Sequence, residues 1–188
     1  MILNDTKPCL IRAGNEGQFH PNSATYQHSM PHQIAQFIHR HHVVSLACQF
    51  EGHIWCASCF YIFDEYLARL IILTKRTTYH GQLMLKNPHI AGTISAQPDN
   101  IREIEGIQFR ATARYLSDSV EEQKALARYL MRFPVAKQLP SDVWEIAFNE
   151  IKHTQNMHTF AEKTIWQKEN KMLLDSDSPA QFEPTNSP

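Results

Sequence analysis

Short apolar runs of the type found in β-strands recur along the middle of the chain. The first two, VVSLACQF and HIWCASCFYIF, are rich in β-branched and aromatic residues and are separated only by Glu51-Gly52. Because glycine permits a tight reversal, we expect these two runs to form a β-hairpin. Later runs have the same character, and Gly106 predicts a bulge in the longest of them. Strands are therefore expected at 43–50, 53–63, 68–74, 89–97 and 101–116, as two short strands separated near Asn149-Glu150 within 142–156, and at 159–168.

Helical spacing of apolar residues interrupts these strands in three places. A short amphipathic helix is expected to start near Pro31 and to end around His41. A second helix is expected over 78–86, where Asn87-Pro88 supplies a stop. The capping box Ser119-x-x-Glu122 predicts the start of a third helix, which Pro134 ends.

This order of elements predicts the architecture. Short strands joined by hairpins and by one or two helical crossovers are typical of a small, mostly antiparallel barrel with flanking helices. The fold class is therefore expected to be mainly β with added helices (α+β). Residues 1–30 are expected to form a flexible leader, 31–169 a single domain, and 170–188 a disordered tail.

Composition narrows the class of protein. The chain has 188 residues, 43% of them apolar, and a formal net charge of -1, which is ordinary for a globular protein. This charge gives no general attraction to nucleic acid or to anionic lipid, so neither is expected as a partner. No apolar run approaches the roughly 20 residues that span a bilayer, and no membrane association is expected. With four cysteines and no recognisable secretion signal, we expect a cytoplasmic protein with free thiols.

One stretch, LIILTKRTTYHGQLM, changes abruptly from a buried strand to a cluster of hydroxyls and cations. Thr77 and Thr78 lie where the strand gives way to a helix, and the N–H groups that start a helix attract anions. Together with Lys75, Arg76 and His80, they have the chemistry to hold a phosphate group. The plainer alternative is that Thr77 or Thr78 only caps the helix. The local sequence leaves both interpretations open.

Other clusters of metal-ligating residue types have simpler explanations. Cys56-Ala57-Ser58-Cys59 looks like a metal-binding Cys-x-x-Cys, but residues three apart on a strand point to opposite faces. Cys48 is expected nearly opposite Cys56 across the hairpin, yet a disulfide is not expected in a reducing compartment. His39 and His42 could share a helix face, although the helix dipole alone favours cations near a C-terminus. No metal site is expected.

A series of motifs carries a resemblance to a known family. CASCFYIFD, IILT, TTYH, AGTISAQP, GIQF, RFPVA and VWEI occur in this order over most of the expected domain. The series closely resembles the YhbP-like family, which belongs to the pyridoxamine 5'-phosphate oxidase-like, FMN-binding split-barrel superfamily. The resemblance implies a six-stranded antiparallel split β-barrel that forms a homodimer. It also implies that FMN binds in clefts between the two subunits.

The resemblance also implies which residues contact the cofactor. The segment that leaves the central strand would hold the phosphate, and the neighbouring strand would lie along the isoalloxazine ring. The last strand approaches the flavin in the superfamily, although its tryptophan could equally be core. The expected cofactor-binding residues are Thr74, Lys75, Thr77, Thr78 and His80 on the phosphate segment, Ser58, Cys59, Phe60 and Tyr61 on the neighbouring strand, and Lys163 and Trp166 on the last strand.

Two departures from the oxidase bear on function. The oxidase has an Arg-Lys pair where this chain has Tyr79-His80, and an arginine where this chain has Ser58. Fewer charge-assisted hydrogen bonds to the phosphate imply weaker FMN binding. The expected function is an FMN-binding flavoprotein that acts as an oxidoreductase on a small molecule. The alternative is a non-enzymatic protein that binds or senses FMN, haem or another cofactor.

Overall fold

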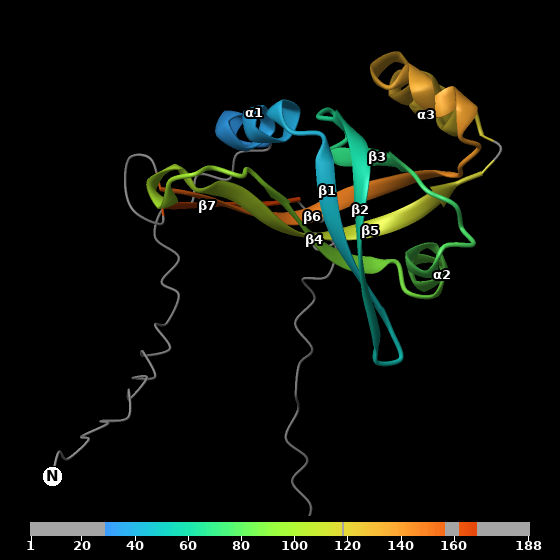
Figure 1. The fold of residues 1–188 in the computed structure, drawn as a ribbon, viewed down its shortest axis with the longest axis horizontal. Coiled ribbons are helices and arrows are strands. Elements are labelled where there is room, and N and C mark those ends of the chain that lie inside the picture. The colour runs from blue at the N-terminus through green and yellow to red at the C-terminus, as the bar shows by residue number, and fades with distance from the viewer. Residues whose placement is uncertain (1–28, 118, 157–161, 169–188) are drawn as a thin grey trace, which may run out of the picture.

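A computed structural model describes residues 29–117, 119–156 and 162–168. These residues form seven antiparallel strands and three α-helices with their connecting loops (Figure 1). Six strands form a closed ring in the order β3-β2-β1-β4-β5-β6, because β3 also pairs with β6, and β7 adds to β6 outside this ring. The predicted mainly β fold with a six-stranded antiparallel barrel is confirmed. The strands are β1 (Val43–Phe50), β2 (His53–Asp64), β3 (Arg69–Leu73), β4 (His89–Ser95), β5 (Glu105–Leu116), β6 (Val143–Gln155) and β7 (Glu162–Gln167).

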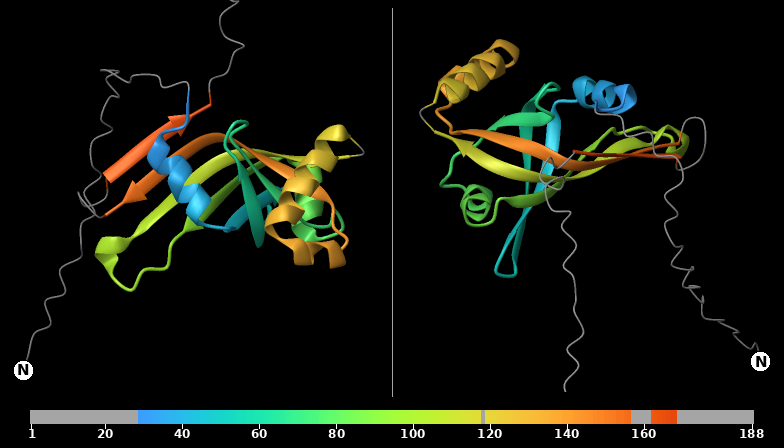
Figure 2. Two further views of the ribbon diagram at one scale, coloured as in Figure 1. Left: turned by 90° about the horizontal axis from the view of Figure 1, so that it is seen from above. Right: turned by 180° about the vertical axis from the view of Figure 1, so that it is seen from behind.

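The three helices lie on two sides of the barrel. Figures 1 and 2 show α1 and α3 on one side and α2 on the other. The sequence predicted all three, and Ser119 caps α3 as expected, with its hydroxyl accepting a hydrogen bond from the Glu122 N–H. The helices are α1 (His32–Arg40), α2 (Tyr79–Lys86) and α3 (Val120–Arg132), and two short 3-10 helices cover Ile101–Glu103 and Pro134–Gln138.

Two predictions about the long strands are wrong. Gly106 is not a bulge, because it pairs regularly with Ser95 on one side and Thr154 on the other. The stretch around Asn149 does not end a strand, and β6 runs unbroken through it. Instead the β5–β6 register shifts there, since Arg110 pairs with Glu150 but Ala111 pairs with Phe148. Asn149 is thus the extra residue of a bulge, which bends β6 without ending it.

The core lies inside the barrel, and α1 closes one side of it. Ile34, Phe37 and Ile38 of α1 are fully buried, as their helical spacing requires. Inside, the rings of Phe109 and Phe148 meet edge to face at 4.9 Å. A Cβ atom at Gly92 would lie 2.4 Å from the Phe109 ring, so glycine at this position makes room for that ring.

A network of ion pairs attaches α3 to the barrel. The Arg69 guanidinium of β3 is almost completely buried and contacts Asp64 at 3.3 Å and both Glu121 and Glu145 at 2.5 Å. Arg114 also contacts Glu121 and Glu145, and Arg128 of α3 contacts Asp64 at 2.8 Å. Three arginines therefore face three carboxylates, and the buried charges are compensated.

The leader expected at 1–30 and the tail expected at 170–188 fall outside the described residues, apart from positions 29 and 30. None of the described helices combines the length and the apolar character that a membrane span requires.

We predict that Arg69→Met lowers the free energy of unfolding by about 3–5 kcal/mol, because it leaves buried carboxylates without their shared cation. Urea denaturation measures this. The matched control is Arg110→Met, which removes an exposed arginine that pairs with Glu150 and should cost less than about 1 kcal/mol. Equal losses in the two variants would contradict a structural role for the buried network.

Candidate functional site

The loop between β3 and α2 brings together three of the residues that the sequence singled out. β3 ends at Leu73, and the chain turns through 74–78 into α2. In this corner the His80 Nε2 atom lies 2.7 Å from the Thr74 hydroxyl and 3.2 Å from the Thr78 hydroxyl. We call Thr74, Thr78 and His80 the corner cluster.

Thr78 caps α2, as the plainer interpretation of the sequence predicted. Its side-chain oxygen accepts a hydrogen bond from the Gly81 N–H and donates one to the Lys75 carbonyl oxygen. A Cβ atom at Gly81 would lie 2.5 Å from that same carbonyl oxygen, so glycine is required for the tight turn. The hydroxyl therefore has its structural partners in place while it also faces His80.

Asp142, just before β6, and Trp144 of β6 hold the corner in place from outside. The Asp142 carboxylate accepts a hydrogen bond from the Arg76 N–H at 2.6 Å and pairs with the Arg76 guanidinium at 3.3 Å. The buried Trp144 donates its indole N–H to the Thr74 carbonyl oxygen at 3.1 Å. Sequence reasoning missed both anchors, because each lies about 70 residues from its partner and no local pattern marks such contacts.

The electrostatic character of the corner is close to neutral. Burial lowers the pKa of His80 below its ordinary value of 6.5, so the imidazole is uncharged at neutral pH. Arg76 is held by Asp142 and lies over the Tyr115 ring at 4.4 Å. Lys75 and Thr77 are exposed on the loop. An anion here would thus meet Lys75, hydroxyl groups and the N–H groups at the start of α2, with little fixed positive charge.

The four β2 residues divide between the two faces of their strand. Ser58 and the half-exposed Phe60 face outward, whereas Cys59 and Tyr61 are buried in the core. The Tyr61 hydroxyl donates to the Ile38 carbonyl oxygen at 2.8 Å, and burial raises the pKa of the Cys59 thiol to about 11. Only Ser58 and Phe60 therefore present side chains to a ligand outside the barrel.

The two residues on β7 lie far from the corner cluster within one chain. Lys163 pairs with Thr154 near the end of β6, and β3 pairs with the other end of the same strand. From Asp142 to Thr154 a strand extends roughly 40 Å. Trp166 is buried in the core, which was the plainer interpretation of that residue, and Lys163 is exposed. A single chain does not assemble the β7 and corner residues into one site.

The Cys-x-x-Cys thiols and the His39 and His42 side chains are dispersed in the structure. Cys56 is exposed and Cys59 is buried, so the Cys-x-x-Cys thiols point to opposite faces. Cys48 lies opposite Trp55, next to Cys56, and all three thiols are free. His39 bonds Glu65, whereas the His42 ring stacks on Phe60. No group of three or more His, Cys, Asp or Glu residues suited to a metal occurs among residues 29–117, 119–156 and 162–168.

The outward face of three adjacent strands is nearly free of charge. Register places Ser45 between Ser58 and Thr93, and Ala47 between Cys56 and Ala91. Val43 and Phe60 pair at the edge of this area and are 41% and 52% exposed. We call this area the outer face; it consists of Val43, Ser45, Ala47, Cys56, Ser58, Phe60, Ala91 and Thr93.

Comparison with known sequences places the chain in a family. A UPF0306 protein of Haemophilus ducreyi is 46% identical over 140 residues, which cover 74% of this chain and 96% of the relative. The chain belongs to the UPF0306 family. No protein-family model matches the sequence.

Solved structures show the same fold in proteins of low sequence identity. A haem-binding protein of Mycobacterium smegmatis matches 74% of this UPF0306 chain with a TM-score of 0.61 and 15% identity, over 59% of its own length. A FAD-binding protein of Mesorhizobium loti matches 64% with a TM-score of 0.55 and 14% identity, over 89% of its length. A candidate pyridoxamine 5'-phosphate oxidase of Listeria innocua matches 64% with a TM-score of 0.51 and 13% identity, over 94% of its length. The barrel is therefore the split barrel of pyridoxamine 5'-phosphate oxidase-like proteins.

We predict that the His80 environment makes the protein less stable in mild acid. The unfolded chain takes up a proton at His80 near pH 6.5, whereas the folded chain resists it because its pKa is lowered. The free energy of unfolding should therefore fall as the pH is lowered from about 7.5 to about 5.5. Urea denaturation of His80→Gln should show a smaller fall, and His89→Gln, which changes an exposed histidine on β4, should behave as the parent protein does.

Proposed function

We propose that the protein is a homodimeric flavoprotein that binds FMN between its subunits and acts as an oxidoreductase on a small molecule. The observation that carries the proposal is the corner cluster, where hydroxyl and imidazole groups converge at the start of a helix on a split barrel. Split-barrel proteins that bind FAD or haem have this fold, which makes a planar redox cofactor a reasonable ligand. The motif series further favours a place among YhbP-like proteins.

The donor set of the corner fits a phosphate group in part. Thr74, Thr78 and His80 would supply hydrogen bonds, the first N–H groups of α2 would add partial positive charge, and Lys75 would supply the nearby cation. Thr78 donates to Lys75 and Arg76 pairs with Asp142, so neither is free to bind without rearrangement. We therefore expect modest FMN affinity. Bound FMN would supply hydride or electron transfer, and these residues would hold and orient it.

The outer face supports the proposal of a homodimer. Its side chains are small or apolar, which lets a second copy of the chain approach closely, and none is charged. Ser58 and Phe60, expected along the isoalloxazine ring, belong to it, so a partner seated there would enclose the flavin. A partner would also be the source of Lys163, which is exposed and remote from the corner cluster of its own chain, whereas Trp166 is buried in its own core.

A non-enzymatic protein that binds haem is the second candidate. It is supported by the Mycobacterium smegmatis haem-binding protein and by a Vibrio cholerae haem storage protein that matches 72% of this chain with a TM-score of 0.54. Exposed histidines such as His39 and His42 would then be the ligand candidates. Titration with haem decides this version, because axial histidine ligation shifts and sharpens the Soret band.

We predict that Thr78→Ala weakens FMN binding about fivefold, or about 1 kcal/mol, because it removes one hydroxyl partner of the phosphate. His80→Glu should weaken it further by placing a negative charge in the corner cluster. Flavin absorbance after FMN addition, with fluorescence quenching to obtain Kd, measures both effects.

The control separates ligand contact from helix capping. Ser119→Ala removes the cap of α3 and should cost a similar amount of stability, about 1 kcal/mol, without changing the Kd for FMN. Thr78→Ser keeps the hydroxyl and should bind as the parent does. If Thr78→Ala and His80→Glu bind FMN like the parent protein, the corner is only a helix cap and the phosphate lies elsewhere.

We predict that Ser45→Glu converts the dimer to a monomer, because it places a charge at the centre of the outer face. Light scattering after size exclusion should report twice the chain mass of 21.8 kDa for the parent and the single mass for the variant. FMN binding should be lost with the dimer. Gln123→Glu adds the same charge on exposed α3 and should leave the dimer intact. A parent protein that is monomeric at all concentrations would refute the shared site.

A further inference from the structure

An open cleft of about 400 Å³ lies between the C-terminal end of α1, the C-terminal end of β2 and the last turns of α3. None of the corner-cluster residues lines it. We propose that this cleft is a second binding site, which takes a small organic anion with a flat apolar body. It excludes the corner cluster proposed to hold the FMN phosphate, although Tyr61 of the expected cofactor-binding strand lines it. The volume lies within the range of small-ligand pockets in proteins.

The positive end of the cleft is formed by α3. Arg128 and Arg132 lie one helical turn apart and both line the cleft. Arg128 shares Asp64 with Arg69, and the three arginines of that network already face three carboxylates. Arg132 lies over the Phe133 ring and has no carboxylate partner among the described residues. The guanidinium of Arg132 is therefore an uncompensated cation beside the cleft.

No carboxylate side chain belongs to the lining of the cleft. His39 bonds the Glu65 carboxylate, which is thereby engaged. The last carbonyl groups of α1 are also occupied, since Phe37 accepts from the His41 ring and Ile38 accepts from the Tyr61 hydroxyl. The negative end of the α1 dipole is thus partly satisfied before a ligand arrives. Arg132 is therefore the arginine of the lining that no carboxylate of the described residues pairs.

Apolar groups form much of the remaining lining, beside His41, His42 and Tyr61. Ile38, Ile62 and Phe63 come from α1 and β2, and Met131 comes from α3. Phe63 meets the His39 ring edge to face at 5.0 Å, so ring surfaces already pack at this wall. Met131 is 83% exposed, and its flexible side chain is free to cover a ligand. A bare inorganic anion would leave these surfaces unused, which is why the proposed ligand carries an apolar ring as well as one negative group.

Two fluorescent probes test both halves of the proposal. Anilinonaphthalenesulfonate has a flat aromatic body with a sulfonate, and phenylnaphthylamine has a similar body without the charge. The parent protein should bind the sulfonate probe at one site per chain and more tightly than the neutral one. Arg132→Gln should weaken the sulfonate probe about tenfold while leaving the neutral probe unchanged, because one charge-assisted hydrogen bond is lost. Arg132→Lys should restore part of the affinity.

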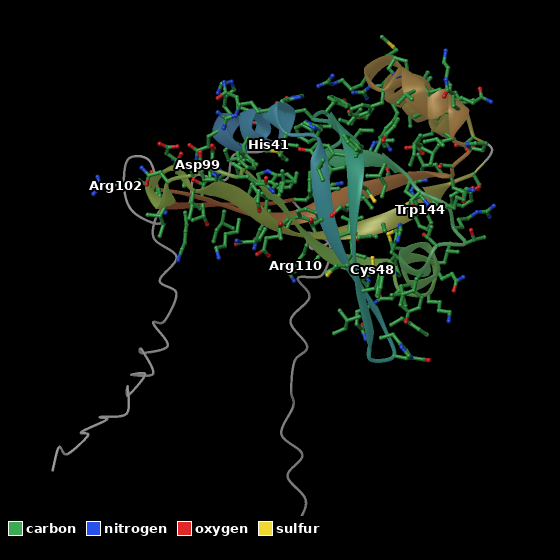
Figure 3. All side chains as sticks on the ribbon, viewed as in Figure 1. His41, Cys48, Asp99, Arg102, Arg110 and Trp144 are labelled. Carbon is green, nitrogen blue, oxygen red and sulfur yellow. The ribbon has the colours of Figure 1, made fainter. Side chains whose placement is uncertain are left out.

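The matched control is Arg102→Gln, which removes an exposed arginine at the other end of the molecule from α3 (Figure 3) and should not change either affinity. The proposal is overturned if Arg132→Gln binds the sulfonate probe as the parent does, or if Arg102→Gln loses as much. Displacement of the sulfonate probe by FMN would also overturn it, because the cleft would then be the flavin site itself. Failure of FMN to bind anywhere would leave the probe result standing and would count only against the proposed flavoprotein.

Discussion

The pairing of β3 with β6 is the constraint on which the rest of the structure depends. It closes the six-stranded ring, and it joins residues about 75 positions apart in the chain, such as Leu70 and Ile146. The same contact continues past the end of β3, where the Thr74 N–H donates to the Asp142 carbonyl oxygen. Because closure fixes Thr74 against β6, the loop that follows can reach α2 only through the tight corner. The position of the corner cluster is thus a consequence of how the barrel closes.

The same closure determines where α3 lies. Arg69 starts β3 and pairs with Ala147, so its guanidinium is delivered beside Glu145 of β6. Glu121 and Arg128 of α3 then complete the charge compensation from above. Most of the α3 surface is exposed, and only Ala125 and Tyr129 are buried. The ion pairs and the small apolar cluster that Ala125 and Tyr129 form with the barrel together hold the helix, and a cleft remains between it and β2.

Local sequence signals explain which parts of this arrangement could be predicted. The β1–β2 hairpin, the three helices and the Thr78 cap follow from turn residues, helical spacing and capping chemistry, all of which act over a few residues. The polar pair Asn149-Glu150 resembles a turn, so the sequence predicted the end of a strand where the structure has a bulge. In the barrel Asn149 accepts hydrogen bonds from Thr112 and Lys168, so its polar groups are satisfied without ending the strand. Asp142 and Trp144 had no local signal, since only ring closure brings them to the corner.

The corner cluster is organised by its own hydrogen bonds, and this bears on what it can bind. Thr74, Thr78 and His80 satisfy one another, and the buried imidazole is neutral. An incoming phosphate must therefore replace existing contacts, and its gain is only the difference between the two sets of bonds. An Arg-Lys pair would have brought fixed charge that no internal hydroxyl could match. Phosphate binding would also favour protonation of His80, because the anion stabilises the imidazolium. The affinity of this corner for a phosphate is consequently coupled to the titration of His80, a coupling that an arginine-based site would lack.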